Sequence, residues 1–263
     1  MNRVAIVTGD TSGIGRCTAL QLHRDGYTVY GLSRRGTGDG EVRHLSADVT
    51  DEASVAAAVK TIMDEQGRID ILVNAAGFGI SGAVECTETT DAKGLFDVNF
   101  FGMVTMNRAV LPLMHKQGSG RIVNISSVAA PIAIPFQTYY SASKAAINTY
   151  TMALGNEVRP YGITVCAVQP GDVSTGFTAA RKKSVVGDDL YGGRISRSVA
   201  VMEHDEQTGM QPETLGRFIA RVAEKKSHKP IHTCGFQYKL FCVIVKLLPA
   251  GLTNFLVGKI YAK

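Results

Sequence analysis

Short apolar runs alternate with longer amphipathic stretches along most of the chain. The short runs are rich in β-branched residues and end in polar or glycine-rich turns, which is typical of buried strands in a parallel sheet. They cover residues 3–8, 27–32, 42–47, 69–73, 121–125 and 163–168. The longer stretches predict helices at about 16–24, at about 52–66, at about 89–117 with a break near 99–102, and from the residue after Gln137 to about 162.

This alternation predicts an α/β fold: a single-domain, doubly wound parallel sheet of about seven strands, Rossmann-like, with an apolar helical extension at the C-terminus. No linker or internal repeat interrupts the chain, so we expect one domain over residues 1–263. Such sheets bind ligands where their strands end. Polar or small residues follow the predicted strands at Ser33-Arg34, Asp48, Asn74, Ser127 and Pro170-Gly171.

Composition and charge argue against several other classes of protein. The formal net charge is +5, and no lysine- or arginine-rich tract indicates nucleic-acid binding. The five cysteines form no C-x-x-C pair, which suits reduced thiols and a cytoplasmic location. Pro230 lies between His228 and His232 and disrupts a helical metal-binding face, so no metal site is expected. The apolar stretch 240–257 is interrupted by a lysine, a proline, a glycine and an asparagine, so we do not expect it to span a membrane.

A glycine-rich turn joins the first predicted strand to the first predicted helix. Glycines let the main chain approach a pyrophosphate, and free N–H groups at a helix N-terminus favour bound anions. The turn therefore predicts a dinucleotide site, although such a turn can also serve only to connect strand and helix. The residues expected at the phosphates are Gly9, Thr11, Ser12, Gly13, Ile14 and Gly15.

The second predicted strand ends at Ser33, Arg34 and Arg35 and not at an acidic residue. An aspartate or glutamate there would bind the adenosine ribose hydroxyls and select NAD(H), whereas arginine binds a 2′-phosphate through paired hydrogen bonds. We therefore expect NADP(H) in preference to NAD(H). The alternative is a pair of solvated loop arginines.

Tyr140 and Lys144 are one turn apart and share a face of a predicted helix, whereas Tyr139 points elsewhere. A phenol is a poor proton donor or acceptor at neutral pH, and a neighbouring ammonium group lowers its pKa towards the useful range. The spacing thus suggests a proton-transfer pair. An exposed tyrosine–lysine pair without a catalytic role is the common alternative.

Six motifs occur in the chain in an order that resembles the classical short-chain dehydrogenase/reductase family, over about residues 3–234. They are the glycine motif at 8–15, Asn74-Ala75-Ala76-Gly77, Asp97-Val98-Asn99, Ser127, the pair Tyr140 and Lys144, and Pro170-Gly171. The resemblance implies hydride transfer, with Ser127 binding the substrate oxygen and Tyr140 exchanging a proton with it. Lys144 would lower the pKa of Tyr140 and hold the nicotinamide ribose, and Asn99 would support a water-linked proton relay.

The resemblance also implies further cofactor contacts. Asp48 would meet the adenine edge and Thr175 the carboxamide. The other expected contacts, besides Tyr140 and Lys144, are Val49, Asn74, Ala75, Gly77, Pro170, Gly171 and Val173. One departure is Asp10, because this position is usually small in the family. We expect Asp10 to turn to solvent or to cap the glycine turn through main-chain N–H groups.

Substrate specificity is expected to come from loops and from the C-terminal part of the chain. Loops 78–82 and 128–136 are small or apolar, and residues 176–211 predict a mobile substrate lid. The extension over 235–263 would cover an apolar pocket, pack on the domain, or contact a membrane surface or another subunit. With the lid and loop 78–82, it resembles the branch that contains 17β-hydroxysteroid and retinol dehydrogenases.

These features lead us to expect an NADP(H)-dependent alcohol dehydrogenase or ketone reductase. Its expected substrate is a lipophilic small molecule, in the first place a hydroxysteroid. A 3-oxoacyl thioester reductase is the enzymatic alternative, and a non-catalytic NADP(H)-binding sensor is the alternative of another class. We further expect a homodimer or homotetramer, and we keep a peripheral membrane contact through the extension open.

Overall fold

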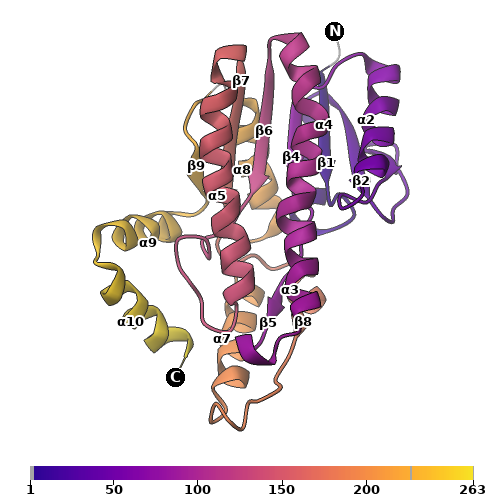
Figure 1. Cartoon of the computed structure of the whole chain (residues 1–263). Helices are drawn as coiled ribbons and strands as arrows, with labels where there is room; N and C mark the ends of the chain where they lie inside the picture. Colours follow the sequence, from indigo (N-terminus) through magenta and orange to yellow (C-terminus); the bar gives the residue numbers. More distant parts are fainter. Residues whose placement is uncertain (1–2, 226, 263) are drawn as a thin grey trace.

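The computed structural model describes residues 3–225 and 227–262 and is built around one sheet. The sheet has seven parallel strands in the order β3-β2-β1-β4-β6-β7-β9 (Figure 1). The strands are β1 (Arg3–Thr8), β2 (Tyr27–Ser33), β3 (Arg43–Ser46), β4 (Ile71–Asn74), β6 (Gly120–Ile125), β7 (Ile163–Gln169) and β9 (Ile231–Thr233). The strand order reverses between β1 and β4, where doubly wound sheets bind ligands. The predicted doubly wound parallel sheet is therefore confirmed.

Helices cover both faces of the sheet, and alternate residues of β1 contribute to the two cores. Val4 and Ile6 pack with the helices on one face, and Ala5 and Val7 with the helices on the other. The first face carries α2 (Glu52–Gln66), α4 (Gly102–Gln117) and α5 (Thr138–Val158), and the second carries α1 (Gly13–Arg24) and α8 (Pro212–Glu224). Because both faces are buried, the strands need continuous apolar runs, as the sequence shows.

The strand β9 was not located by the hydrophobic pattern. Its three residues pair in parallel with Ala167–Gln169 of β7, and the carbonyl oxygen of Pro230 accepts a hydrogen bond from the Ala167 N–H at 2.8 Å. All three are only partly buried, so the segment contains no apolar run. His232 belongs to this strand, and the described residues contain no group of three side chains that could hold a metal ion.

The helical region expected over 89–117 is continuous, but its type changes in the middle. α3 (Thr89–Phe96) is followed by a π-helical turn over Asp97–Phe101 and then by α4. The predicted break near residues 99–102 is therefore a π-helical turn and not a loop. Such turns are frequent at functional sites, and this one carries Asn99, whose side chain is buried.

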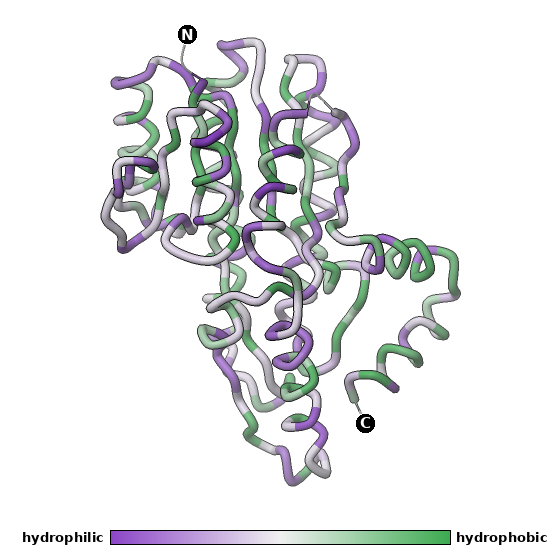
Figure 2. Tube along the Cα trace, turned by 180° about the vertical axis from the view of Figure 1, so that it is seen from behind, coloured by the Kyte–Doolittle hydropathy of each residue, from purple (hydrophilic) through white to green (hydrophobic). Residues whose placement is uncertain are grey.

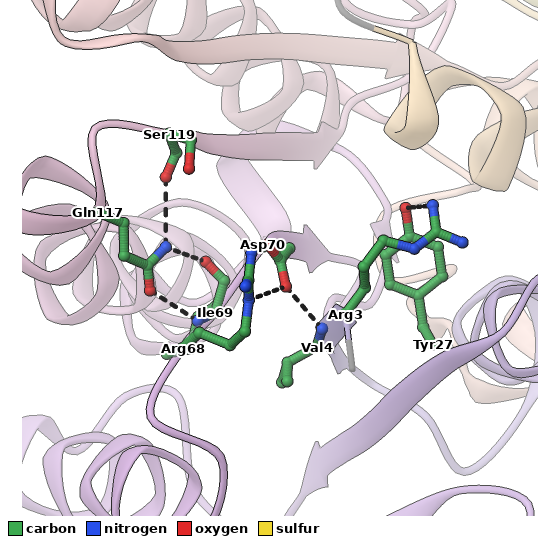
Figure 3. A network of polar contacts seen from close by, with 8 residues as sticks. All are labelled: Arg3, Val4, Tyr27, Arg68, Ile69, Asp70, Gln117 and Ser119. Atoms are coloured by element: carbon green, nitrogen blue, oxygen red, sulfur yellow. Dashed lines mark hydrogen bonds and ion pairs between the residues drawn. The ribbon is translucent and has the colours of Figure 1, made fainter. Parts of the chain in front are cut away.

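A polar network holds the amino ends of β1 and β4, away from the strand ends that bind ligands (Figure 3). The Asp70 carboxylate accepts a hydrogen bond from the Val4 N–H at 2.7 Å and two from the Arg68 guanidinium at 2.5 and 3.0 Å. Gln117, the last residue of α4, bonds the N–H of Ile69 at 2.9 Å and its carbonyl oxygen at 2.8 Å. These contacts fix the two central strands relative to each other at the end opposite the site.

Residues 176–211, the predicted lid, form a subdomain beyond the carboxyl ends of the strands (Figure 1). They contain α6 (Phe177–Ala180), β8 (Lys182–Lys183) and α7 (Arg194–Gln207). β8 pairs with β5 (Ile80–Ser81), which lies in the loop after β4. The segment is thus joined to the body of the molecule by main-chain pairing.

The chain ends in two helices that project from the body of the molecule, α9 (Phe236–Leu247) and α10 (Ala250–Tyr261). Figure 2 shows that most of this arm is hydrophobic. Many of its apolar side chains are exposed, among them Phe236 at 81% and Leu247 at 78%. In the part of the chain that the structure describes, no helix is long and apolar enough to cross a membrane.

Candidate active site

The glycine turn after β1 brings the main chain unusually close to itself. Gly9 has a φ of +71°, and a Cβ atom on Gly15 would lie 2.2 Å from the carbonyl oxygen of Gly9. No side chain fits at position 15 without moving the turn. α1 begins at Gly13, three residues earlier than predicted, so its free N–H groups lie within the turn itself. The turn therefore presents main-chain donors to an anion.

A groove of about 730 Å³ runs along the carboxyl ends of the central strands from this turn. It brings together fourteen of the predicted cofactor residues. They are Gly9, Thr11, Ser12, Gly13, Ile14, Gly15, Ser33, Arg34, Arg35, Asp48, Val49, Ala75, Gly77 and Thr175. Arg34 and Arg35 are exposed, and Asp48 is the one acidic residue among the described residues that line the groove. The donor set thus fits a dinucleotide with an added phosphate better than one with free ribose hydroxyls.

Asp48 is held in a fixed orientation at the edge of the groove. One carboxylate oxygen accepts hydrogen bonds from the Thr50 N–H at 2.9 Å and the Thr50 hydroxyl at 2.7 Å. These two bonds hold the pKa of Asp48 below its usual value. The carboxylate is therefore ionised at neutral pH and oriented to accept a further hydrogen bond.

A narrow cavity of about 120 Å³ adjoins the groove and contains the predicted catalytic side chains. Ser127, Tyr140 and Lys144 line it, together with Pro170, Gly171 and Val173. Groove and cavity share Ile14, Ala75, Gly77, Thr175 and Phe177 among their lining residues. A ligand in the groove and a second molecule in the cavity would therefore meet at this common wall.

The ionisation of Tyr140 and Lys144 differs from the sequence-based expectation. Burial raises the pKa of Tyr140 to about 12, although a hydrogen bond to Ser127 acts in the opposite direction. Burial also lowers the pKa of Lys144 to about 8. Lys144 Nζ donates a hydrogen bond to the Ile125 carbonyl oxygen at 2.8 Å and lies 5.6 Å from the centre of the Tyr140 ring. The net shift of the tyrosine pKa is upward, not downward as expected, because desolvation outweighs the hydrogen bond with Ser127 and the positive charge of Arg181.

Comparison with known proteins agrees with this arrangement. A family model described as "short chain dehydrogenase" matches residues 3–185. This chain belongs to the short-chain dehydrogenase/reductase family. It is 43% identical over 228 residues to a 3-ketodihydrosphingosine reductase from Bacteroides thetaiotaomicron, which covers 86% of this chain and 85% of the relative.

Solved structures show the same similarity over nearly the whole chain. A short-chain dehydrogenase from Streptomyces avermitilis superposes with a TM-score of 0.85 at 29% identity, covering 97% of this chain and 96% of that one. The structure of ElxO with NADP bound superposes with a TM-score of 0.76 at 25% identity, covering 91% of this chain and all (100%) of that one. The similarity therefore includes a large part of the C-terminal region.

In this short-chain dehydrogenase, Asn99 lies behind the cavity and does not line it. Its side-chain oxygen accepts a hydrogen bond from the Phe78 N–H, and its side-chain nitrogen donates to the Phe78 carbonyl oxygen, both at 2.9 Å. A Cβ atom on Gly77 would lie 2.9 Å from that side-chain oxygen and 3.9 Å from Lys144 Nζ. Asn99 therefore fixes the loop after β4 next to the catalytic lysine.

The prediction that Asn74 contacts the cofactor is wrong for its side chain. Asn74 is the last residue of β4, one residue beyond the predicted strand end, and its side chain is buried. Its Nδ2 atom donates to Asn107 Oδ1 at 2.8 Å and to Asn124 Oδ1 at 2.9 Å. Asn124 in turn donates to the hydroxyl of Thr151 at 2.9 Å. The amide joins β4 and β6 to the helices α4 and α5.

Asp10 corrects a second expectation, because it neither turns to solvent nor caps the glycine turn. Its side chain is buried against β2, where a Cβ atom on Gly31 would lie 2.0 Å from Asp10 Oδ2. Asp10 Oδ2 lies 3.0 Å from Nδ1 of His44 on β3. The pair connects the phosphate-binding turn to the outermost strand. Thirty-four residues separate the two in sequence, so no local pattern indicated the contact.

The lid, the arm and one loop residue complete the cavity with side chains that the sequence did not single out. They are Asp172 after β7, Phe177 on α6, Met202 and Glu206 on α7, and Tyr261 at the end of α10. Four of them, all except Asp172, lie in segments that were predicted to cover the substrate. Asp172 directly follows the Pro170-Gly171 motif, and this position could have indicated that it lies at the cavity. No sequence motif indicated that Tyr261 does.

Proposed function

We propose that this enzyme is an NADP(H)-dependent reductase of a ketone on a lipophilic substrate. One observation carries the proposal: Tyr140 and Ser127 share a narrow cavity that joins the glycine-rich groove. A nicotinamide at the common wall would supply the hydride. The proton would come from the Tyr140 phenol, so that a carbonyl becomes a secondary alcohol.

The side chains of the cavity have distinct tasks in this proposal. The Ser127 oxygen accepts a hydrogen bond from the Ala129 N–H at 3.0 Å, which leaves the hydroxyl hydrogen to bind the substrate oxygen. Tyr140 donates its proton to that oxygen as negative charge develops there. Lys144, held by the Ile125 carbonyl, supplies a positive charge beside the phenolate that forms. Asn99 supports this arrangement through the loop at Phe78.

Several features support NADP(H) as the cofactor. Arg34 and Arg35 lie at the end of β2, where the adenosine would be bound, and both are exposed to a ligand. A guanidinium group binds phosphate in a bidentate way. The similar structure of ElxO contains NADP. NADPH should therefore bind more tightly than NADH.

For the substrate, we propose a long-chain ketone as the first candidate and the hydroxysteroid predicted from the sequence as the second. The relative named for 3-ketodihydrosphingosine, a long-chain ketone, supports the first. The volume of this cavity, about 120 Å³, is smaller than the roughly 300 Å³ or more of ordinary ligand pockets. It admits a carbonyl and the adjoining part of a chain, whereas a steroid ring system requires movement of the lid. The apolar wall formed by Ile134, Phe177 and Met202 suits either substrate.

We also propose that the arm of α9 and α10 contacts a membrane surface. Residues 235–262 contain lysines and no acidic residue, and ten large apolar side chains of the arm are exposed. They are Phe236, Leu240, Phe241, Val243, Ile244, Leu247, Leu252, Phe255, Leu256 and Ile260. Apolar and cationic residues together favour an anionic bilayer surface. A homodimer or homotetramer that buries this arm is the alternative.

The decisive test is NADPH oxidation by the purified protein with a panel of ketones. The panel contains a long-chain ketone, hydroxysteroid precursors, retinal and a 3-oxoacyl thioester, and it is repeated with NADH. Turnover of the long-chain ketone supports the proposal. Turnover of the thioester alone supports a 3-oxoacyl reductase. NADPH binding with no turnover of any compound supports a non-catalytic sensor.

A further inference from the structure

A buried pair of polar side chains, Asp10 and His44, lies behind the phosphate-binding end of the groove. Asp10 stands between Gly9 and Thr11 in the sequence, and both of these residues line the groove whereas Asp10 does not. The side chains of Asp10 and His44 are only 5% and 7% exposed. Neither has a role in the reduction proposed above. The pair can therefore act on a bound cofactor only through the residues that it holds in place.

The pair joins segments that are separate in the sequence. Asp10 Oδ2 lies 3.0 Å from His44 Nδ1, and the carboxylate packs so closely on Gly31 of β2 that it leaves no room for a Cβ atom there. The imidazole lies against Gly36, where a Cβ atom would be 2.7 Å from its Cε1 and 3.0 Å from its Nε2. Gly36 directly follows Arg35. His44 therefore supports the main chain next to the two arginines expected at the 2′-phosphate.

The arginine loop, residues 34–42, connects β2 to β3, and all of it before its last residue is exposed. Two further contacts hold it. The Ser33 hydroxyl donates a hydrogen bond to the carbonyl oxygen of Arg35 at 3.0 Å, and Asp39 forms an ion pair with Arg16 on α1. An exposed loop keeps its side chains in one place only while such contacts offset the entropy that it loses on ordering. The imidazole beneath it is the buried part of this support.

The carboxylate of Asp10 is itself unfavourable in a turn that binds phosphates, because like charges repel. His44 counters this by holding the carboxylate on β2, outside the lining of the groove. Asp10 Oδ1 and His44 Nε2 have no hydrogen-bond partner among the described residues. Within the described part of the chain, the imidazole is thus the group that fixes the direction of this carboxylate.

We propose that Asp10 and His44 are positioning residues for the 2′-phosphate of NADP(H). The imidazole supports the arginine loop from beneath, and the pair keeps the Asp10 carboxylate away from the phosphates. Both residues act through Arg34 and Arg35, which line the groove. This inference rests on the NADP(H) preference of the proposed function and concerns the same groove.

The two cofactors should respond differently to loss of the pair. The 2′-phosphate is what distinguishes NADP(H) from NAD(H), and it is the group that the arginines serve. The glycine turn and Asp48 would contact parts that the two cofactors share. Loss of the pair should therefore weaken NADPH binding and leave NADH binding nearly unchanged. Ser127 and Tyr140 line the adjoining cavity, so kcat at saturating NADPH should also stay the same.

The test isolates the phosphate by comparing two nucleotides, adenosine 2′,5′-bisphosphate and adenosine 5′-monophosphate, in calorimetric titrations of the full chain. The wild-type protein should bind the bisphosphate about tenfold more tightly or better, as for charge-assisted contacts. His44→Ala should reduce this ratio about fivefold or more and leave the affinity for the monophosphate within about twofold. Asp10→Asn, which keeps an acceptor for the imidazole, should retain most of the ratio.

Limited proteolysis of the cofactor-free protein provides a second readout. Trypsin cleaves after Arg34 and Arg35 more readily when the loop leaves its support. Mass spectrometry should therefore detect faster cleavage at these two positions in His44→Ala than in the wild-type protein or in Asp10→Asn.

Gly36→Ala tests the contact without changing either buried side chain, and it decides if His44→Ala does not fold. The added Cβ atom forces the loop and the imidazole apart, so the preference for the bisphosphate should fall as in His44→Ala. Gly38→Ala is the matched control in the same loop. Its Cβ atom would come no closer than 3.3 Å to the Val42 carbonyl oxygen, and the ratio should be kept.

Three results would contradict these expectations. An unchanged ratio in Gly36→Ala and His44→Ala overturns the inference. Equal losses of affinity for the two nucleotides also overturn it, since the pair then only stabilises the fold. If the wild-type protein binds both nucleotides equally, the NADP(H) preference of the proposed function is itself wrong, and the inference fails with it.

Discussion

The amine of Lys144 lies 5.6 Å from the centre of the Tyr140 ring and is held there by the main chain of β6. Both side chains line the same cavity, and burial moves the two pKa values in opposite directions. The tyrosine becomes a weaker acid and the lysine a weaker base. Proton transfer at this site is therefore sensitive to whether Lys144 carries its charge.

The pKa of about 8 at Lys144 predicts a pH dependence of ketone reduction. Below this pH the amine is protonated and stabilises the phenolate formed at Tyr140, and above it the charge is lost. The kcat/KM for reduction should therefore fall as the pH rises above about 8. Initial rates at saturating NADPH, between about pH 6 and pH 10, measure this limb.

Stability should change in the opposite direction over the same range. The pKa of Lys144 is lower in the folded protein than its ordinary value of 10.5, so the unfolded chain binds the proton more tightly. The contribution of this group to the free energy of unfolding therefore rises between about pH 8 and pH 10.5. If kcat/KM falls above about pH 8 while the protein stays folded, the fall is due to deprotonation of Lys144. A kcat/KM that stays constant through pH 8 contradicts this explanation.

Replacement of the phenol hydroxyl tests the proton donor. Tyr140→Phe should lower kcat for ketone reduction by about 10²- to 10⁴-fold, the usual effect of losing a positioned acid. NADPH affinity, measured by fluorescence titration, should change little. Tyr139→Phe is the control, because Tyr139 does not line the cavity. Full turnover in the Tyr140 variant would rule out this residue as the donor.

Cofactor preference should depend on Arg34. We expect Arg34→Ala to raise the KM for NADPH about tenfold, since one charge-assisted contact to a phosphate is lost, and to leave the KM for NADH unchanged. Steady-state kinetics with both cofactors provides the measurement. Arg217→Ala, an exposed arginine on α8, removes the same charge outside the groove. A parallel loss with NADH would show that Arg34 supports the fold and not the 2′-phosphate.

The buried pair of Asp10 and His44 should contribute to stability. Asp10→Ala leaves the imidazole without its partner and is expected to lower the free energy of unfolding by about 1–3 kcal/mol. Thermal unfolding followed by circular dichroism measures the effect. Asp64→Ala breaks the exposed pair with Lys60 and should cost less than about 0.5 kcal/mol. Equal effects of the two variants would mean that the buried contact adds nothing.

Membrane contact through the arm predicts binding to anionic vesicles. Sedimentation with phosphatidylglycerol-containing vesicles should recover the wild-type protein and much less of the double variant Phe236→Asp, Leu247→Asp, in which two exposed apolar side chains become charged. Light scattering without vesicles measures the oligomeric state of both proteins. If the wild-type protein does not sediment with vesicles, and the double variant differs only in dissociating into smaller oligomers or monomers, the arm is instead a subunit interface.

Much of the fold could be predicted because each central strand is buried on both faces and therefore consists of a continuous run of apolar residues. β9 could not, since its residues Ile231, His232 and Thr233 are only partly buried and pair along one edge with β7. The position of Asn74 at a strand end was predicted correctly. The direction of its side chain was not, because that depends on Asn107 and Asn124, which are distant in sequence.

The active site, too, could be predicted from the sequence only where its residues belong to local motifs. Residues that belong to the family motifs, such as Ser127 and Tyr140, could be assigned through local spacing and family resemblance. Asp172 and Tyr261 reach the cavity from a loop and from the last helix, and only the packing of the arm brings them together. The pKa of Tyr140 was misjudged for a related reason, because its burial depends on elements far along the chain.

The contact between Tyr238 and the loop after β7 gives the arm a wider significance. The Tyr238 ring occupies the space beside Gly171, where even a Cβ atom would lie 2.2 Å from it, and its hydroxyl binds Asp172. The groove, in contrast, is lined by residues that precede position 181. The arm thus reaches the substrate cavity through Tyr261 and does not line the groove. Exchange of residues 235–263 between relatives should then transfer substrate range without altering the dinucleotide that each one uses.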